Sequence, residues 1–302
     1  MQDDEFTRDG TADGAHPLTR YGWDAAWERA WAAHPLTRAR DHLVPARVTC
    51  VHRGACDVET PVGPQRVRTD LDHEPTTGDW GVLDLDRPDA ALVGILPRRS
   101  SLDRAAVSGT SRAQSLAANV DVVVIAVAAD SRTGLTRVER FLALAWESGA
   151  RPVVALTKAD LLGPDRVEEV VAATAAAAPG VDVVAVSSAT GDGLAALRSA
   201  VAGTVVLVGS SGAGKSTLAN ALLGQERFAT GGVRGVDGKG RHTTVHRELV
   251  ALPGGLVLVD TPGLRSVGVG DLDEGLHRTF ADLEDLAVDC RFSDCSHAGE
   301  PG

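Results

Sequence analysis

The sequence predicts an α/β protein whose main domain is a parallel β-sheet covered by helices on both faces, preceded by a small β-barrel. Between residues 120 and 203, apolar strands alternate with helical segments. Between residues 44 and 112, short β-type runs are separated by clusters of Gly, Pro and Asp. A glycine-rich turn at residues 209–214 joins one further strand to a helix. Strand–helix alternation is typical of parallel sheets, and closely spaced short strands are typical of barrels and sandwiches.

Composition favours a soluble, cytoplasmic protein that does not enter a membrane. The chain has 302 residues, enough for two or three domains, and 43% of them are hydrophobic. No apolar run reaches the ~18 residues that a membrane span requires, and the acidic start of the chain is unlike a signal peptide. The net charge of −11 argues against a surface that binds nucleic acid everywhere, although it is compatible with a local basic patch.

Residues 1–43 are predicted to form an acidic tail and a tryptophan-bearing helix. The first 20 or so residues carry too few apolar side chains to order themselves. Trp23, Trp27 and Trp31 recur every four residues, which places three indoles on one face of a helix of about three turns. This face either packs against the body of the protein, the commoner use, or stacks on RNA bases.

Residues 44–113 are predicted to form a five-stranded oligonucleotide/oligosaccharide-binding barrel. Its β-type runs cover residues 46–51, 66–69, 80–85 and 91–96. Four arginines gather near its exit, at Arg98, Arg99, Arg104 and Arg112. Arginines suit phosphate contacts, but solvated loop arginines are an equal alternative here.

Residues 114–268 are predicted to form the main domain. The expected strands cover residues 122–127, 153–156 and 183–186, and the helices that come after them cover residues 135–147, 165–178 and 193–201. A fourth strand at residues 205–208 leads into the glycine-rich turn, and a hairpin at residues 244–260 comes after it. Continuous apolar strands of this kind are buried on both faces in a parallel sheet.

The glycine-rich turn fits the phosphate-binding pattern G-x-x-x-x-G-K-[ST]. Its glycines let the backbone curl so that N–H groups point at a polyphosphate from the positive end of the next helix. Lys215 is expected on the β- and γ-phosphates, and the Ser216 hydroxyl on Mg²⁺. The alternative is a structural turn that carries Gly-Lys-Ser by chance. The predicted nucleotide-binding residues here are Gly209, Ser210, Ser211, Gly212, Ala213, Gly214, Lys215, Ser216 and Thr217.

Two segments at the ends of successive strands predict a guanine nucleotide. The first matches [NT]-K-x-D and consists of Thr157, Lys158, Ala159 and Asp160. The Asp160 carboxylate can accept from N1–H and the 2-amino group of guanine, neither of which adenine offers. Ser188 and Ala189 come after the next strand and are expected to present a backbone N–H to the guanine O6. Ligands of open α/β sheets bind at the carboxyl ends of the strands, so the two segments support each other.

A third motif and the order of all three predict a circular permutation. Asp260 and Gly263 match D-x-x-G, whose Asp holds Mg²⁺ and whose Gly N–H contacts the γ-phosphate. The guanine motifs precede the phosphate-binding loop instead of coming after it. A permutation moves the chain ends and leaves the sheet intact. Residues 260–267 then lead directly into the C-terminal tail, and we expect the tail to move with the state of the γ-phosphate.

With these motifs in this order, the sequence from residue 44 onward resembles the circularly permuted GTPases of small-subunit maturation, the ribosome small subunit-dependent GTPase A family. Further segments that carry the resemblance are Thr-Gly-Asp-Trp80, Leu-Pro-Arg-Arg99, Leu-Ala-Ala-Asn-Val-Asp121, Gly-Lys-Gly-Arg-His-Thr-Thr244 and the Cys-x4-Cys-x-His tail. The resemblance implies GTP hydrolysis stimulated by the small ribosomal subunit, with GTP/GDP and Mg²⁺ bound. It also implies that the barrel and a C-terminal zinc module bind rRNA. We expect a monomer.

The resemblance also implies a histidine in the hydrolytic step. GTPases commonly place a glutamine after D-x-x-G to orient the attacking water, and this sequence has Leu264 there. His242 is expected to take over that role, with Thr243 or Thr244 binding Mg²⁺ in the GTP state. The predicted catalytic residues are therefore His242, Lys215, Thr243 and Thr244.

The four cysteines fall into two pairs with different expected roles. Cys290 and Cys295, together with His297, offer three zinc ligands in the predicted helical tail, residues 269–302. Tetrahedral zinc takes four ligands, and the family pattern places the fourth just beyond Gly302, so we expect zinc to be held weakly, completed by water or absent. Cys50 and Cys56 lie in the barrel with no histidine recognisably placed beside them, so we expect structural thiols.

Two other functions remain open from the sequence. One is a nucleotide-gated RNA-binding module in which slow hydrolysis is incidental, and GTPase rates with and without small subunits distinguish it. The other is a P-loop ATPase or kinase in which residues 157–160 match by coincidence, and competition between GTP and ATP distinguishes it.

Overall fold

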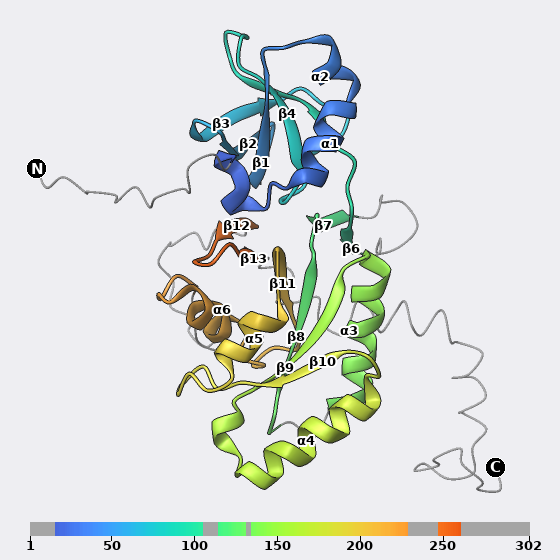
Figure 1. Cartoon of the computed structure of the whole chain (residues 1–302), viewed down its shortest axis with the longest axis vertical. Coiled ribbons are helices and arrows are strands. Elements are labelled where there is room, and N and C mark those ends of the chain that lie inside the picture. The colour runs from blue at the N-terminus through green and yellow to red at the C-terminus, as the bar shows by residue number, and fades with distance from the viewer. Residues whose placement is uncertain (1–15, 105–113, 131–133, 229–246, 261–302) are drawn as a thin grey trace, which may run out of the picture.

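The computed structural model describes residues 16–104, 114–130, 134–228 and 247–260. A small barrel with the N-terminal helices against it stands above a larger sheet that carries helices on both faces (Figure 1). Among the described residues, we find no helix that is both long and apolar enough to cross a membrane.

The N-terminal segment packs against the barrel through its tryptophans. It contains η1 (Pro17–Tyr21), α1 (Ala25–Ala33) and α2 (Pro35–Ala39), so ordered structure begins earlier than the predicted tail allows. Asp24 caps α1, and Trp23 therefore precedes the helix, so the prediction of three tryptophans on one helix is wrong. The Trp23 and Trp27 rings lie 4.8 and 6.0 Å from the Trp80 ring of the barrel. Both side chains are buried, which confirms the packing interpretation and excludes base stacking by them.

The predicted five-stranded barrel is confirmed. Its strands are β1 (Leu43–His52), β2 (Ala55–Thr60), β3 (Gly63–Thr69), β4 (Trp80–Asp84) and β5 (Ala91–Ile95). They pair in the order β1-β2-β3-β5-β4, and β4 pairs again with β1 to close the barrel. The β3–β5 pair is parallel and the others are antiparallel. The predicted strands omitted β2, whose short run is half polar and lies close to β1 in the sequence.

The two barrel cysteines face opposite sides of the barrel wall. Cys56 is fully buried among the apolar side chains that fill the barrel, and burial raises its pKa to about 12. It is a structural thiol, as predicted. Cys50 lies beside His52 and Asp57, so the expectation that no histidine accompanies these cysteines is wrong for Cys50. A histidine two residues along the same strand is the signal that could have shown this.

The main sheet has the predicted α/β topology. Its strands are β8 (Val122–Ala128), β9 (Arg151–Thr157), β10 (Asp182–Ala185), β11 (Thr204–Val208), β12 (Glu248–Ala251) and β13 (Val257–Asp260). They lie in the order β10-β9-β8-β11-β13-β12; only β12 is antiparallel to its neighbour in this domain, β13. A pairing of β12 with β1 at Glu248 and Cys50 links this sheet to the barrel.

Alternate side chains of the central strands fill two separate cores. Helices α3 (Gly134–Ser148) and α4 (Pro164–Ala177) cover the face that carries Val123 and Ile125. Helices α5 (Leu194–Ala200) and α6 (Lys215–Leu223) cover the face that carries Val122 and Val124. Because both faces are covered, the strands are continuously apolar, which explains why they are recognisable in the sequence.

A second, two-stranded sheet was not predicted. It pairs β6 (Ser101–Arg104) with β7 (Gln114–Ala118) in antiparallel fashion. This ribbon joins residues on either side of the predicted boundary at residue 113 and lies between the barrel and the main sheet (Figure 1). The domain bounds at residues 43, 113 and 268 remain predictions.

Candidate functional site

The glycine-rich turn connects the centre of the main sheet to α6. Strand β11 is buried along its whole length and ends at Val208, and α6 begins at Lys215 after Gly214. The φ angles of Gly209, Gly212 and Gly214 are all positive, at 140°, 79° and 79°. A Cβ at Gly209 would overlap the Ala126 carbonyl oxygen of β8, so glycine is required there. The backbone thus curls as a phosphate-binding loop requires.

Lys215 lies against this loop. Its Nζ donates to the carbonyl oxygens of Gly209 and Ser210, at 2.6 and 2.7 Å. The ammonium group is therefore held near the curled backbone, at the N-terminal end of α6. A cation combined with a helix N-terminus favours an anionic ligand.

The end of β9 contacts the glycine-rich turn directly. The Thr157 hydroxyl donates to the Ala213 carbonyl oxygen at 2.7 Å, across 56 residues of sequence. Lys158 comes next in the left-handed region, with φ of 59°, and begins a turn, η2 (Ala159–Leu161), that contains Asp160. The structure therefore brings the [NT]-K-x-D segment beside the phosphate-binding loop.

The loop after β10 joins the same group. The Ala159 N–H donates to the Val186 carbonyl oxygen at 3.2 Å, which ties the segment after β9 to the end of β10. Ser187 is buried, and its hydroxyl accepts from the Thr190 N–H at 3.1 Å. Ser188 and Ala189 lie between them in this turn, half-buried and exposed respectively. Both predicted base-binding segments are thus at the carboxyl edge of the sheet.

Asp260 ends β13, the strand beside β11 in the sheet. Its backbone lies at the same carboxyl edge as the glycine-rich turn. The other predicted ligands and catalytic residues lie outside the described part of the chain, namely His242, Thr243, Thr244, Gly263, Cys290, Cys295 and His297.

The opposite, amino edge of the sheet carries a group of polar side chains that the sequence analysis did not identify. Asp121 accepts from the Thr204 N–H at 2.6 Å, and Arg47 of the barrel donates to the Thr204 hydroxyl at 3.0 Å. The Arg47 guanidinium lies 4.7 Å from the centre of the Trp80 ring and is only 1% exposed. Burial lowers the pKa of Arg47 to about 10, although the negative charges of Asp121 and Asp79 act in the opposite direction and raise it.

A cavity of about 360 Å³ lies at this amino edge. It is bordered by the N-terminal segment, the barrel and the starts of β8 and β11, and Arg47, Arg99 and Asp121 are among its lining residues. Asn119 also lines it, with its side-chain amide donating to the Gly78 carbonyl oxygen and accepting from the Arg99 N–H, both at 2.9 Å. These contacts join the barrel to the main sheet.

Two of the four exit arginines have carboxylate partners, so for these two the interpretation as merely solvated loop arginines is wrong. Arg98 donates through Nε and Nη2 to the two carboxylate oxygens of Asp79, at 2.7 and 2.8 Å, and Asp79 is fully buried. Arg99 pairs with Asp24 at 2.9 Å and stacks on Trp27, 3.8 Å from the ring centre. Both guanidinium groups, although partly exposed, are held by carboxylates, Arg98 by Asp79 and Arg99 by Asp24 at the start of the N-terminal helix.

The strand order and the curled loop define the class of protein: a circularly permuted P-loop GTPase fold with a β-barrel before it. Solved structures agree. A structure of YjeQ from Thermotoga maritima matches with a TM-score of 0.57 and 25% identity, covering 86% of this chain and 88% of that one. A structure of YloQ, described as a circularly permuted GTPase, matches in fold with a TM-score of 0.54 and 24% identity, covering 86% and 85% of the two chains.

The particular family is identified by sequence comparison. The family model for RsgA GTPase matches residues 95–270, and the chain belongs to this family. It is 50% identical over 297 residues to the small ribosomal subunit biogenesis GTPase RsgA of Streptomyces avermitilis, covering 95% of this chain and 79% of the relative. The corresponding protein of Streptomyces coelicolor is 49% identical over 293 residues, covering 94% and 79% of the two chains. The resemblance noted in the sequence is thereby confirmed.

Proposed function

We propose that this protein hydrolyses GTP during the biogenesis of the small ribosomal subunit. The observation that carries the proposal is the hydrogen bond between Thr157 and Ala213, because it sets the base-binding segment beside the phosphate-binding loop. The two segments occur in reversed order along the chain and meet only in the folded sheet. The names of the RsgA relatives support the assignment to the small subunit.

Each part of the carboxyl edge has a proposed role in binding GTP. The backbone N–H groups of residues 209–217 surround the phosphates, and the Lys215 ammonium neutralises the β- and γ-phosphates. Asp160 and the backbone of Ala189 recognise the guanine. Ser216 and Asp260, together with Thr243 or Thr244, would hold Mg²⁺, which would neutralise charge that develops on the phosphates. The Gly263 N–H contacts the γ-phosphate.

We assign orientation of the attacking water to His242. The proposal rests on the family membership and on Leu264 at the position where a glutamine commonly stands. Substitution His242→Ala should lower kcat on small subunits and leave the Kd for GTP unchanged. Unchanged turnover in the presence of small subunits would refute this role.

The barrel and the C-terminal tail are proposed to contact rRNA. Closed barrels of this strand order commonly bind oligonucleotides. Cys290, Cys295 and His297 supply three of the four ligands that a structural zinc takes, so zinc would order the tail if a fourth ligand or a water completes it. Because it would act on the small ribosomal subunit, we propose that the protein is cytoplasmic. We also propose that it acts as a monomer.

The test is to measure GTP hydrolysis with and without purified small ribosomal subunits. We expect stimulation by small subunits, and a fall of about 100-fold or more in kcat/KM for Lys215→Ala because the γ-phosphate loses its cation. Absence of stimulation would contradict the proposed function and favour a GTP-gated RNA-binding module.

Nucleotide selectivity is tested separately with Asp160→Asn. An amide can donate to the 2-carbonyl of xanthine but cannot accept from both guanine donors, so preference should move from GTP toward XTP. Asp165→Asn, an exposed change in the first turn of α4, is the matched control and should leave GTP preferred. Equal binding of ATP and GTP by the unmodified protein would exclude the guanine assignment.

A further inference from the structure

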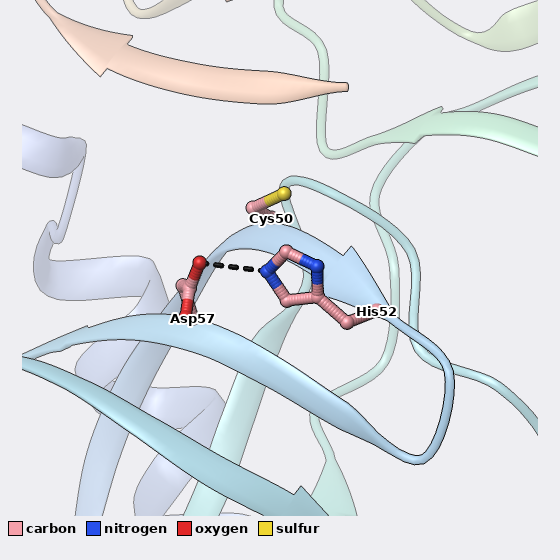
Figure 2. A group of neighbouring side chains, drawn as sticks. All are labelled: Cys50, His52 and Asp57. Atoms are coloured by element: carbon pink, nitrogen blue, oxygen red, sulfur yellow. Dashed lines mark hydrogen bonds and ion pairs between the residues drawn. The ribbon is translucent and has the colours of Figure 1, made fainter. Parts of the chain in front are cut away.

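The outer face of the β1–β2 hairpin carries a cysteine, a histidine and an aspartate that converge. Cys50 and His52 are two residues apart on β1, and Asp57 of β2 lies directly opposite Cys50 in the strand register. Figure 2 shows the three side chains pointing toward one another. One ligand atom from each lies within 4.8 Å of the other two.

A β-bulge produces this arrangement. Val48 points into the barrel, and strict alternation would place Cys50 and His52 there as well. The register of β1 against β2 shifts between Val48 and Cys50, so that Val51 packs with the barrel core while Cys50 and His52 face outward. Bulges re-aim side chains in this way at functional positions.

Cys50 is shielded from solvent, whereas His52 and Asp57 are accessible to it. Cys50 is 8% exposed and is paired in register with Glu248 of β12 at the edge of the main sheet. The side chains of His52 and Asp57 are 24% and 33% exposed, so an ion can reach them from solvent. The cluster is therefore located where the barrel meets the main sheet.

The donor set has a specific chemical preference. A thiolate, an imidazole and a carboxylate together suit Zn²⁺ and related borderline divalent ions, whereas Mg²⁺ and Ca²⁺ prefer oxygen donors only. Zinc bonds of about 2.0–2.3 Å in a tetrahedron separate the ligand atoms by about 3.3–3.8 Å. His52 Nε2 and Asp57 Oδ2 now lie 2.8 Å apart, so small side-chain rotations reach this geometry.

The carboxylate already attracts cationic and donor groups. Arg66 donates to Asp57 through Nε at 2.6 Å and Nη2 at 2.9 Å, and the same Nη2 lies 3.1 Å from His52 Nε2. A neutral imidazole nitrogen cannot donate to Asp57 and accept from Arg66 at the same time. A bound cation would replace Arg66 at the carboxylate and accept the imidazole lone pair.

We propose that Cys50, His52 and Asp57 bind a zinc-class divalent cation at the junction of the barrel and the main sheet. The fourth position is open to a water, or to Glu248 if its carboxylate leaves the ion pair with Arg227; the backbone of Glu248 is in register with Cys50 across β1 and β12. These three barrel residues are different from those proposed to bind the nucleotide and from the predicted zinc ligands Cys290, Cys295 and His297. Bound metal would cross-link the end of the β1–β2 hairpin.

The experiment titrates Co²⁺, and then competing Zn²⁺, into the full chain. The protein carries Cys290→Ser and Cys295→Ser, which remove the thiol ligands predicted in the tail. A thiolate-to-cobalt absorption band that saturates at one ion per chain is expected. Cys50→Ser should remove the band, and His52→Ala should weaken affinity by at least about tenfold, since even outer-shell changes cost that much. Cys56→Ala, which removes the thiol inside the barrel, is the matched control and should keep the band.

Arg66 provides a sharper test, because it competes with the metal for Asp57. Arg66→Ala should tighten Co²⁺ binding, whereas Asp57→Asn should weaken it by about tenfold or more. Absence of a thiolate band in the protein without the tail thiols, or a band that survives Cys50→Ser, would overturn the proposal. Unaltered thermal unfolding of metal-free Cys50→Ser would show that loss of the band is not loss of the fold.

Discussion

The two edges of the main sheet differ in how they are built. At the carboxyl edge, the candidate nucleotide site consists of short contiguous segments, and in the proposed binding mode the backbone groups of residues 209–214 contact the phosphates. At the amino edge, Arg47 of the barrel contacts Thr204, which is also bonded to Asp121, so residues far apart in the sequence join the barrel to the sheet. Nearby, Arg98 and Asp79 tie the exit of the barrel to the segment that precedes β4. A motif in one stretch is recognisable from sequence, and a junction assembled from scattered residues is not.

Some of the sequence segments that carry the family resemblance belong to this junction, but their sequences alone did not show that they lie there. Three of the segments that carry it, which end at Trp80, Arg99 and Asp121, contribute to the amino edge or to the packing around it. In the described part of the chain, they do not line the candidate nucleotide site. In this structure their contacts connect the barrel, the N-terminal helix and the main sheet.

The largest expected effect tests that interpretation. Asp79→Ala should lower the free energy of unfolding by about 3–5 kcal/mol, because it leaves Arg98 partly buried without its carboxylate. Asp70→Ala, which breaks the exposed ion pair with Arg87, is the control and should cost less than about 1 kcal/mol. Urea unfolding followed by tryptophan fluorescence measures both. Equal effects of the two substitutions would show that the junction contributes no special stability.

The second effect concerns the carboxyl edge. Gly209→Ala should destabilise the protein by about 2–3 kcal/mol and weaken GTP binding, because the new Cβ meets the backbone of β8 at a positive φ. Gly212→Ala also has a positive φ but meets no neighbouring atom, so about 1 kcal/mol is expected. Unfolding curves measure the stability of the two variants, and binding of a fluorescent GTP analogue measures their affinity for the nucleotide. A larger loss for Gly212→Ala would contradict the geometry of the loop.

A smaller effect is expected at the cap of α1. Asp24 accepts from the N–H groups of Ala26 and Trp27, both at 2.8 Å, and pairs with Arg99. Asp24→Ala should cost about 1–2 kcal/mol by removing the cap. Asp24→Asn keeps the cap and should cost less. If Asn is as harmful as Ala in thermal unfolding, the charge and not the cap is the stabilising feature.

The smallest effect is the pH dependence of that charge. The Arg99 hydrogen bond lowers the pKa of Asp24 to about 2, from an ordinary value near 4. The ion pair therefore stabilises the fold above about pH 4 and loses this contribution as the pH falls toward 2. Since both side chains are more than a third exposed, the contribution should stay below about 1 kcal/mol. The stability difference between the unmodified protein and Asp24→Asn should shrink over this pH range; a constant difference would contradict the assignment.

Much of the main domain was predictable from the sequence, and less of the barrel. The buried strands and the helices between them were located to within a few residues, because both sheet faces are covered and the apolar runs are continuous. Strand β2 and the β6–β7 ribbon were missed, because short strands with one exposed face resemble polar loops. The roles of Arg98 and Arg99 were also missed, since their partners Asp79 and Asp24 are 19 and 75 residues away.

The sequence by itself determined the strand order along the chain, the phosphate-binding loop and the permuted order of the guanine motifs. Each of these depends on contiguous residues whose local geometry is set by glycine, proline and apolar patterning. Only the tertiary structure decided which side chains meet at the amino edge and which face Cys50 takes. A register shift of one residue reverses every later side chain of a strand, and hydrogen bonding with the neighbouring strand, not local sequence, sets that shift.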